Sequence, residues 1–287
     1  MKNILFYGGA SLLANIWSRY WKDQYNIYLG LHKRWIEIEG TTSIKIGEDI
    51  KELENIIIDY KIDIIINCAG LTNVEECEIK SDKAYYLNGY LPGEIAKITS
   101  KFNIKFIHIS TDHLFNGDKQ KEDENSPVIP LNIYAKSKSI GDQEVLKNDK
   151  SSLVIRTNFF GTGPLYKPSF SDKIISSLKK SQTIQLFTNV FYTPIHVHSL
   201  ANYTFELLKL DSRGVFNICS NDRISKFDFG IMIAEVMSMD KSLITPIKIE
   251  AKTSLTLRPK DMSLSNEKLK NLIKRDIEPL ESQINLL

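Results

Sequence analysis

Apolar residues follow two alternating patterns along the first half of the chain. Short, nearly continuous apolar runs predict buried strands at Lys2–Tyr7, Asn26–Leu31, Asp63–Cys68, Lys105–Ser110 and Ser152–Arg156. Between them, segments with apolar residues every three or four positions predict helices at Ser11–Trp21, Asp49–Tyr60, Ser81–Lys101 and Pro130–Lys147. Strands and helices that alternate in this way predict an α/β fold with a Rossmann-type, doubly wound parallel sheet.

The alternation loosens after Asn158. Glycine and proline interrupt the chain at residues 161–164 and 167–168, and several shorter elements follow to the end. We therefore predict a nucleotide-binding Rossmann domain over residues 1–158 and a smaller α/β lobe, mainly substrate-binding, over residues 159–287. One apolar run in the lobe, residues 214–219, predicts a further strand that returns to the large sheet.

Composition and charge exclude several classes of protein. The 287 residues carry 37 Lys and Arg against 35 Asp and Glu, and no long basic stripe, so nucleic acid is not an expected partner. No segment approaches the roughly 20 apolar residues of a membrane-spanning helix. The apolar start imitates a secretory signal, but Gly8 and Gly9 interrupt it. The three cysteines suit a reducing compartment, and we expect a cytoplasmic protein.

A glycine-containing turn follows the first predicted strand. Aligned with the G-x-x-G-x-x-G fingerprint of dinucleotide-binding turns, the chain has Gly8, Ser11 and Ala14 at the three glycine positions. Such a turn binds a pyrophosphate through the backbone of the following helix, here at Gly8, Ser11, Leu12 and Leu13. Ser11 departs from the pattern because its side chain occupies space that the phosphate usually needs. A turn without a ligand is the alternative interpretation.

The second predicted strand ends in His32, Lys33 and Arg34. In this position an acidic residue would accept the ribose hydroxyls of NAD, whereas basic residues bind the 2′-phosphate of NADP. The sequence therefore favours NADP(H) over NAD(H). A solvated basic loop is the alternative.

Three residues in the middle of the chain form a candidate catalytic group. Tyr134 and Lys138 lie four positions apart, on one face of a predicted helix. An ammonium group beside a phenol stabilises the phenolate, so such a tyrosine can exchange its proton near neutral pH. Thr111, at the end of the preceding predicted strand, can hold the substrate oxygen that Tyr134 protonates. Metal chemistry is not expected, because His196 and His198 have no cluster of carboxylates or cysteines beside them.

Six blocks spread over nearly the whole chain carry a resemblance to a known family. They are NCAGLTNVEECE (67–78), Asn88 with Pro92, ISTDHLFNG (109–117), PLNIYAKSKSIGDQEV (130–145), IRT (155–157) and RPKDMSLSNEKL (258–269). In these blocks the chain resembles the extended short-chain dehydrogenases/reductases, and most of all the dTDP-4-dehydrorhamnose reductase group. The resemblance implies reduction by NADPH of the 4-keto group of a nucleotide-activated 6-deoxysugar, in the synthesis of polysaccharide or glycan precursors.

The resemblance also implies roles for individual residues. It implies a catalytic trio of Thr111, Tyr134 and Lys138, and it places Ala69, Ser110, Tyr134 and Lys138 near the nicotinamide half of the cofactor. It implies a nucleotide-sugar substrate site formed by Thr72, Val74, Asp112, His113, Phe159 and Arg258. His113 and Phe159 stand where this group usually has Tyr and Trp, which leaves the identity of the sugar open.

Related functions on the same scaffold remain as alternatives. A sugar-nucleotide dehydratase is disfavoured, because its Thr-Asp-Glu pattern is Thr111-Asp112-His113 here. A sugar-nucleotide epimerase stays open. So does a non-catalytic NADP-binding subunit like the regulatory partner of methionine adenosyltransferase, which resembles the same reductase group. The sequence does not give the oligomeric state, and a homodimer stays open.

Overall fold

The computed structural model describes residues 1–287. Contacts within the chain divide it into two compact units. The first, which we call the sheet unit, comprises Met1–Ser110, Ile133–Ile155 and Leu207–Val215. The second, which we call the lobe unit, comprises Thr111–Asn132, Arg156–Glu206 and Phe216–Leu287. The domain boundary at residue 158 stays a prediction, since these units are assembled from interleaved segments.

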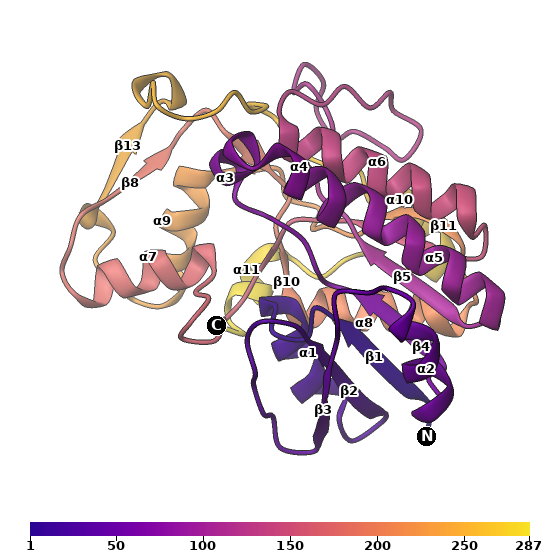
Figure 1. Ribbon diagram of the computed structural model, residues 1–287. Helices are drawn as coiled ribbons and strands as arrows, with labels where there is room; N and C mark the ends of the chain where they lie inside the picture. The colour runs from indigo at the N-terminus through magenta and orange to yellow at the C-terminus, as the bar shows by residue number, and fades with distance from the viewer. The chain divides into compact units, whose positions relative to one another are not determined.

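A seven-stranded sheet is the framework of the sheet unit (Figure 1). It consists of β1 (Asn3–Tyr7), β2 (Asn26–Leu31), β3 (Thr41–Lys45), β4 (Ile64–Asn67), β5 (Lys105–Ile109), β6 (Leu153–Arg156) and β11 (Gly214–Asn217). The spatial order is β11-β6-β5-β4-β1-β2-β3, and the pairs from β3 to β6 are parallel. This is the strand order of a Rossmann-type fold, so the predicted fold class is confirmed.

Helices cover both faces of this sheet. They are α1 (Leu12–Trp21), α2 (Glu52–Asp59), α3 (Val74–Ile79), α4 (Ser81–Ala84), the π-helix η1 (Tyr85–Tyr90), α5 (Leu91–Phe102), α6 (Ile133–Asn148) and the end of α8 (Val197–Lys209). On one face, α2, α5 and α6 pack in a core that includes Leu5 and Phe106 of the strands. On the other face, Phe6 stacks on Trp21 of α1, with ring centroids 6.3 Å apart. Successive strand residues thus serve opposite layers of the fold.

The predicted elements differ from the observed ones in three places. The segment expected as one helix at Ser81–Lys101 is helical throughout, but its residues 85–90 form the π-helix η1. Strand β3 was not predicted, because its sequence TTSIK has a single buried residue, Ile44. Helix α3 was not predicted either. It is only six residues long, and it begins where the Asn73 side chain accepts a hydrogen bond from Glu76 N at 2.8 Å.

The lobe unit is built from short elements. They are β7 (Phe159–Phe160), α7 (Phe170–Lys179), β8 (Ile184–Phe187), β9 (Phe191–Tyr192), β10 (Ile195–His196), the start of α8, β12 (Ile224–Ser225), α9 (Lys226–Val236), η2 (Lys241–Leu243), β13 (Ile244–Ile247), η3 (Ile249–Ala251), α10 (Glu267–Ile273) and α11 (Leu280–Ile284). The strands form three two-stranded sheets, β10-β7, β12-β9 and β13-β8. Helices α7, α9 and α11 share one core, in which Phe229 contacts the rings of Phe160, Phe170 and Tyr192.

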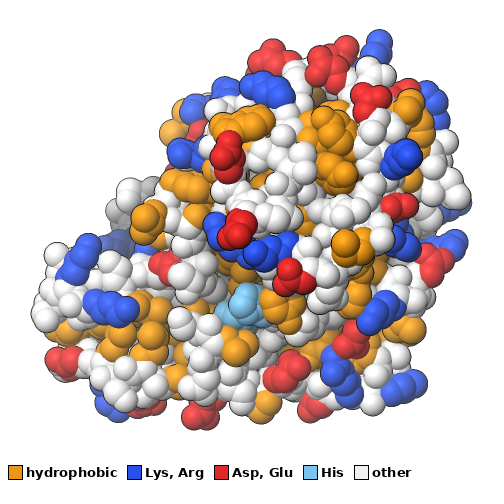
Figure 2. All heavy atoms as spheres, turned by 90° about the horizontal axis from the view of Figure 1, so that it is seen from below, with side chains coloured by type: hydrophobic (Ala, Val, Ile, Leu, Met, Phe, Trp, Pro, Cys, Tyr) orange, Lys and Arg blue, Asp and Glu red, His pale blue; other side chains and the backbone are white.

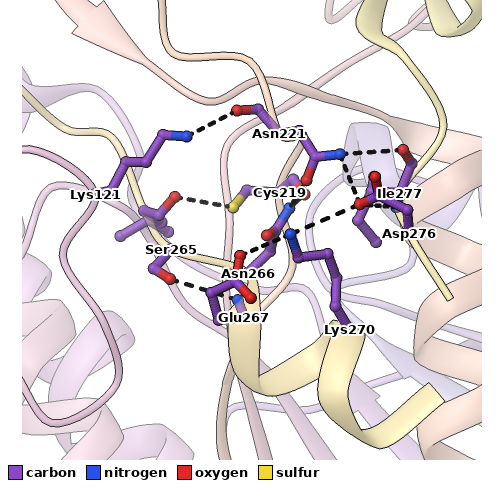
Figure 3. A network of polar contacts seen from close by, with 10 residues as sticks. Lys121, Cys219, Asn221, Ser265, Asn266, Glu267, Lys270, Asp276 and Ile277 are labelled. Carbon is purple, nitrogen blue, oxygen red and sulfur yellow. Dashed lines mark hydrogen bonds and ion pairs between the residues drawn. The ribbon is translucent and has the colours of Figure 1, made fainter. Parts of the chain in front are cut away.

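A polar network within the lobe unit joins Lys121 and the segment 219–221 to residues 264–277 (Figure 3). The Asn266 amide donates to Cys219 O at 3.1 Å and to Asn221 Oδ1 at 2.8 Å, and Lys121 Nζ donates to Asn221 O at 3.1 Å. The Cys219 thiol donates to Leu264 O at 3.3 Å. Burial raises the pKa of Cys219 to about 12, so this thiol is a structural group rather than a nucleophile.

The surface shows charges of both signs. On the face drawn in Figure 2, Lys and Arg side chains alternate with Asp and Glu side chains, which is unlike the basic stripe of a nucleic-acid-binding protein. None of the helices has the length and apolar character needed to cross a lipid bilayer.

Candidate active site

The turn after β1 has the backbone of a dinucleotide-binding loop. Gly8 has φ +84°, and a Cβ there would lie 2.7 Å from Ala69 N, so any other residue would be strained and would clash. Gly9 N donates to Gly30 O of β2 at 2.9 Å. The turn, the end of β2 and Ala69 after β4 therefore meet at one edge of the sheet, the edge where Rossmann-type folds bind their ligands.

Ser11 is the N-cap of α1. Its backbone is extended, with φ −68° and ψ 160°, and its hydroxyl oxygen accepts a hydrogen bond from Ala14 N at 3.2 Å. Leu12 and Leu13, which follow, are buried. The departure from glycine thus has a local reason, because serine is among the residues that best satisfy a free N–H group in the first turn of a helix.

The cap predicts how substitutions of Ser11 should behave. Ser11→Ala should lower the free energy of unfolding by about 1 kcal/mol, and Ser11→Gly by only a few tenths. Ser11→Gly should also bind NADPH more tightly because it removes the Cβ, whereas the alanine variant, which keeps the Cβ, should not. Chemical denaturation and titration calorimetry measure both effects. Weaker NADPH binding by the glycine variant would show instead that the hydroxyl itself contacts the phosphate.

The basic residues after β2 are close to this turn along the sheet edge. His32, Lys33 and Arg34 are exposed, and they directly follow a strand that pairs with β1. Lys45 Nζ of β3 donates to His32 O at 2.8 Å, and His32 Nε2 lies 3.9 Å from the Glu48 carboxylate. The loop thus presents cationic groups at the end of β2, where the ribose end of a dinucleotide lies in Rossmann-type folds.

Asn88 in the π-helix η1 organises the loop after β4. Its side chain accepts from Leu71 N at 2.8 Å and donates to Leu71 O at 2.9 Å and to Ser137 Oγ of α6 at 3.1 Å. Gly141 of α6 makes room for this close packing, because a Cβ there would lie 2.2 Å from Asn88 O. The clamp fixes the backbone next to Thr72, which is exposed, and Val74, which is buried.

Removing the clamp should destabilise the protein. Asn88→Ala leaves the N–H and C=O groups of Leu71 without their partners, so we expect a loss of about 1–3 kcal/mol in the free energy of unfolding. Urea denaturation measures it, with Asn125→Ala at an exposed position as the control. Equal midpoints for the two variants would contradict this account of η1.

Tyr134 and Lys138 are both buried, one turn apart in the first half of α6. The Tyr134 ring belongs to a small apolar cluster with Val74, Cys77 and Ala84. Lys138, one turn later, is 5% exposed, and its Nζ donates to Ile109 O of β5 at 2.6 Å. Burial lowers the pKa of Lys138 to about 8, although Asp142 and Cys68 act in the opposite direction. Its charge therefore changes near neutral pH.

Ser110 and Thr111 follow β5. Ser110 belongs to the sheet unit, and its buried hydroxyl oxygen has no hydrogen-bond partner. Thr111 belongs to the lobe unit. Its Oγ1 donates to Asp112 Oδ1 at 3.3 Å and accepts from His113 N at 3.3 Å. The chain thus passes from one unit to the other between two hydroxyl residues of the predicted site.

The lobe unit brings the predicted substrate residues Asp112, His113 and Arg258 into one group. Asp112 is 1% exposed and accepts from the Asn158 amide at 2.7 Å, while His113 Nε2 lies 3.9 Å from its carboxylate. Burial lowers the pKa of His113 and outweighs the opposite effect of Asp112, while the charges of Lys226 and Arg258 also lower it. His113 is therefore a neutral ring in this group. Phe159 lies in β7 next to Asn158 and is partly buried.

Sequence reasoning missed two members of this group. The first is Asn158, and the second is Lys226 at the start of α9, whose Nζ lies 3.2 Å from the centre of the Tyr192 ring. Burial lowers the pKa of Lys226 to about 7, and the charge of Asp112 raises it. The Tyr192 hydroxyl is buried without a hydrogen-bond partner. No local pattern marks Lys226, because it lies 114 positions after Asp112 (226 − 112) in the sequence.

His196 and His198 have structural contacts in the lobe unit. His196 N donates to Gln283 Oε1 at 2.8 Å, and the His196 ring packs edge-on against Phe160. His198 N donates to His196 Nδ1 at 3.3 Å. Burial lowers the pKa of His196 to about 4, so this imidazole is a neutral packing group.

Taken together, the strand order, the glycine turn and the Tyr134–Lys138 pair define an extended short-chain dehydrogenase/reductase. A comparison with family models identifies the chain further. The model of the RmlD substrate binding domain matches residues 2–287, and the chain belongs to this family. The predicted family is thereby confirmed, and this family comprises sugar-nucleotide reductases, the predicted class of NAD(P)-dependent oxidoreductase.

The similar proteins include two named as reductases and one named as a subunit of a different enzyme. The "Probable low-salt glycan biosynthesis reductase Agl14" of Haloferax volcanii is 32% identical over 68% of this chain and 67% of its own length. The dTDP-4-dehydrorhamnose reductase of Burkholderia thailandensis is 28% identical over 76% and 78% of the two chains. Methionine adenosyltransferase 2 subunit beta of Rattus norvegicus is 27% identical over 78% and 69%.

A solved structure has the same fold over the full length. The dTDP-4-dehydrorhamnose reductase of Bacillus anthracis in complex with NADP superposes with a TM-score of 0.87 over 99% of this chain and 98% of that chain, at 23% identity.

Proposed function

We propose that the protein reduces the 4-keto group of a nucleotide-activated 6-deoxysugar with NADPH, in the synthesis of polysaccharide or glycan precursors. The observation that carries the proposal is that the sheet unit contains both a buried Tyr134–Lys138 pair and a glycine turn with Gly8 at positive φ. The names of the relatives from Haloferax volcanii and Burkholderia thailandensis support the same reaction class.

The residues of the sheet unit have proposed roles in cofactor binding and proton transfer. The helix that Ser11 caps binds the pyrophosphate, together with Gly8, Leu12 and Leu13. Ala69 and the unpartnered hydroxyl of Ser110 line the nicotinamide half. A bound NADPH supplies the hydride. Tyr134 gives its phenolic proton to the carbonyl oxygen as that oxygen becomes an alkoxide, and the ammonium of Lys138 stabilises the phenolate that remains.

The residues of the lobe unit have proposed roles toward the sugar nucleotide. Thr111 holds the carbonyl oxygen with its hydroxyl and shares the developing negative charge. The Asp112 carboxylate accepts hydrogen bonds from sugar hydroxyls, and the neutral ring of His113 can accept or donate one. Arg258 pairs with a phosphate of the nucleotide. Phe159 supplies an apolar surface to the sugar. Thr72 and Val74 of the sheet unit complete the proposed substrate contacts.

Three finer features belong to the same proposal. The exposed basic residues His32, Lys33 and Arg34 support a preference for NADP(H) over NAD(H). A cytoplasmic location agrees with the cysteines, since none of the three forms a disulfide. A homodimer is the assembly to test first, by light scattering of the purified protein.

One alternative rests on a specific observation. The similarity to methionine adenosyltransferase 2 subunit beta keeps open a non-catalytic subunit that binds a dinucleotide. An epimerase would use the same scaffold and the same cofactor. A regulatory subunit would bind NADPH without oxidising it, and an epimerase would return the cofactor to its starting state.

A panel assay tests the proposal and separates these alternatives. Purified protein is mixed with NADPH and 4-keto-6-deoxysugars linked to dTDP, UDP or GDP, and absorbance at the nicotinamide band is followed. We expect stoichiometric oxidation of NADPH with at least one sugar nucleotide. Interconversion of the corresponding 4-hydroxy sugar nucleotides with the oxidised cofactor, without its net reduction, would identify an epimerase. Binding of NADPH without any turnover would identify a regulatory subunit.

A further inference from the structure

His108 lies at the centre of the sheet unit, and the reaction proposed above does not use it. It is the fourth residue of β5 and is fully buried. Asn67, on the neighbouring strand β4, is the residue paired with it. The imidazole lies between two nitrogen atoms. Nδ1 is 3.1 Å from Asn67 Nδ2, and Nε2 is 3.3 Å from Lys138 Nζ. It therefore links a buried amide on one strand to the buried amine on α6.

The orientation of Asn67 determines which ring nitrogen carries the proton. Asn67 Oδ1 accepts a hydrogen bond from Ala69 N at 3.1 Å, so the other end of the amide, Nδ2, faces His108. An amide NH₂ group is only a donor, and Nδ1 must therefore be an acceptor. A neutral imidazole then has its proton on Nε2, the nitrogen that faces Lys138.

With the proton on Nε2, the His108 ring can form a hydrogen bond with the neutral amine of Lys138 but not with its ammonium form. An ammonium group has no lone pair and cannot accept a hydrogen bond from Nε2–H, whereas a neutral amine can. The other titratable groups around Lys138 are Asp142 and Tyr134 on α6 and Cys68 after β4. The Asp142 carboxylate is 4.0 Å from Nε2, too far to accept the proton of the ring in a hydrogen bond.

We propose that His108 is a positioning residue that stabilises the neutral amine of Lys138 and thereby allows Lys138 to return a proton to Tyr134. The inference rests on the proposed function. After Tyr134 has given its proton to the substrate oxygen, one N–H bond of the Lys138 ammonium breaks and the phenolic O–H bond forms again. The remaining amine accepts the hydrogen bond from His108 Nε2–H until solvent protonates it.

The ring itself stays neutral throughout. Burial and the charge of Lys138 hold the pKa of His108 well below its ordinary value, so His108 does not titrate in the working range. It acts as a fixed donor behind Lys138. This role differs from that of Asp142, whose negative charge favours the ammonium form.

Nitrogen NMR of the histidine rings tests the tautomer directly. In the full-length protein labelled with ¹⁵N, we expect the His108 ring to be neutral with the proton on Nε2 over the whole range from weakly acidic to weakly basic pH. Comparison with His108→Gln assigns the signal. If that variant does not fold, single substitutions of the other four histidines assign it by elimination. A proton on Nδ1, or a charged ring, overturns the inference.

The pH dependence of NADPH binding tests the consequence without any sugar substrate. In the wild type, affinity should fall as the pH rises through about 8 and Lys138 loses its charge. His108→Gln offers an amide oxygen to the ammonium, so the fall should move upward by about one pH unit, the equivalent of one hydrogen bond. His108→Phe removes the donor without adding an acceptor, and its shift should be smaller.

His196→Gln, at another buried histidine, is the matched control and should leave the midpoint of the fall unchanged. If the His108 variants bind NADPH more weakly at every pH with an unmoved midpoint, His108 is only a packing residue and the inference is wrong. The two proposals fail separately. A protein that shows the Nε2 tautomer and the shifted midpoint but reduces no keto sugar contradicts the proposed function alone.

Discussion

Replacing Tyr134 with Phe should lower turnover by about 100- to 10,000-fold, the usual contribution of a positioned acid. The phenyl ring keeps the apolar contacts with Val74, Cys77 and Ala84, so the fold should remain intact. Only the hydroxyl is lost. Without it the alkoxide formed by hydride transfer must take its proton from water, and the charge on the oxygen is not relieved in the transition state. Steady-state kinetics with the best sugar nucleotide of the panel measure the effect.

Binding measurements separate this effect from misfolding. The Tyr134→Phe variant should bind NADPH nearly as the wild type does, because the lost hydroxyl acts on the substrate oxygen. Tyr90→Phe, at an exposed tyrosine of η1, removes a hydroxyl of the same kind and should have normal turnover. If Tyr134→Phe retains turnover close to that of the wild type, another group supplies the proton and the role given to Tyr134 is wrong.

The strands of the large sheet could be predicted closely because parallel strands are buried on both faces. The run at 26–31 was predicted with the observed bounds, and the others differ by one or two residues. Strand β3 was not predicted because it lies at the edge of the sheet and is mostly polar, so it has no continuous apolar run. The π-helix η1 could not be predicted either. Its geometry depends on the tertiary contact of Asn88 with Leu71 and Ser137, not on local periodicity.

In the candidate site too, some residues could be predicted from the sequence and others could not. Gly8, Tyr134 and Lys138 were predicted because their spacing and place along the chain carry the signal. Lys226 and Asn158 were missed because their partner, Asp112, lies far from them in the sequence. His108 was also missed. In the sequence it is one polar residue within an apolar strand. Its neighbours Asn67 and Lys138 are brought to it by the strand register and by the packing of α6, which the sequence does not show.

Removing the two cations after β2 should change the cofactor preference by at least tenfold. In the proposed complex, Lys33 and Arg34 contact the 2′-phosphate, which NADPH has and NADH lacks. A hydrogen bond to a charged group contributes about 1.5–3 kcal/mol, and about 1.4 kcal/mol corresponds to a factor of ten in affinity. The double variant Lys33→Ala with Arg34→Ala should therefore bind NADPH at least ten times more weakly, while its affinity for NADH stays nearly the same.

The quantity to measure is the ratio of the dissociation constants for NADPH and NADH, obtained by titration in the same buffer. Lys179→Ala with Lys180→Ala, at exposed positions at the end of α7, removes the same two charges from the lobe unit and should leave the ratio unchanged. Raising the salt concentration should weaken NADPH binding by the wild type and have little effect on the double variant, because the lost contacts are electrostatic and exposed. An unchanged ratio in the Lys33 and Arg34 variant would mean that these side chains are solvated and that the preference for NADP(H) lacks its basis.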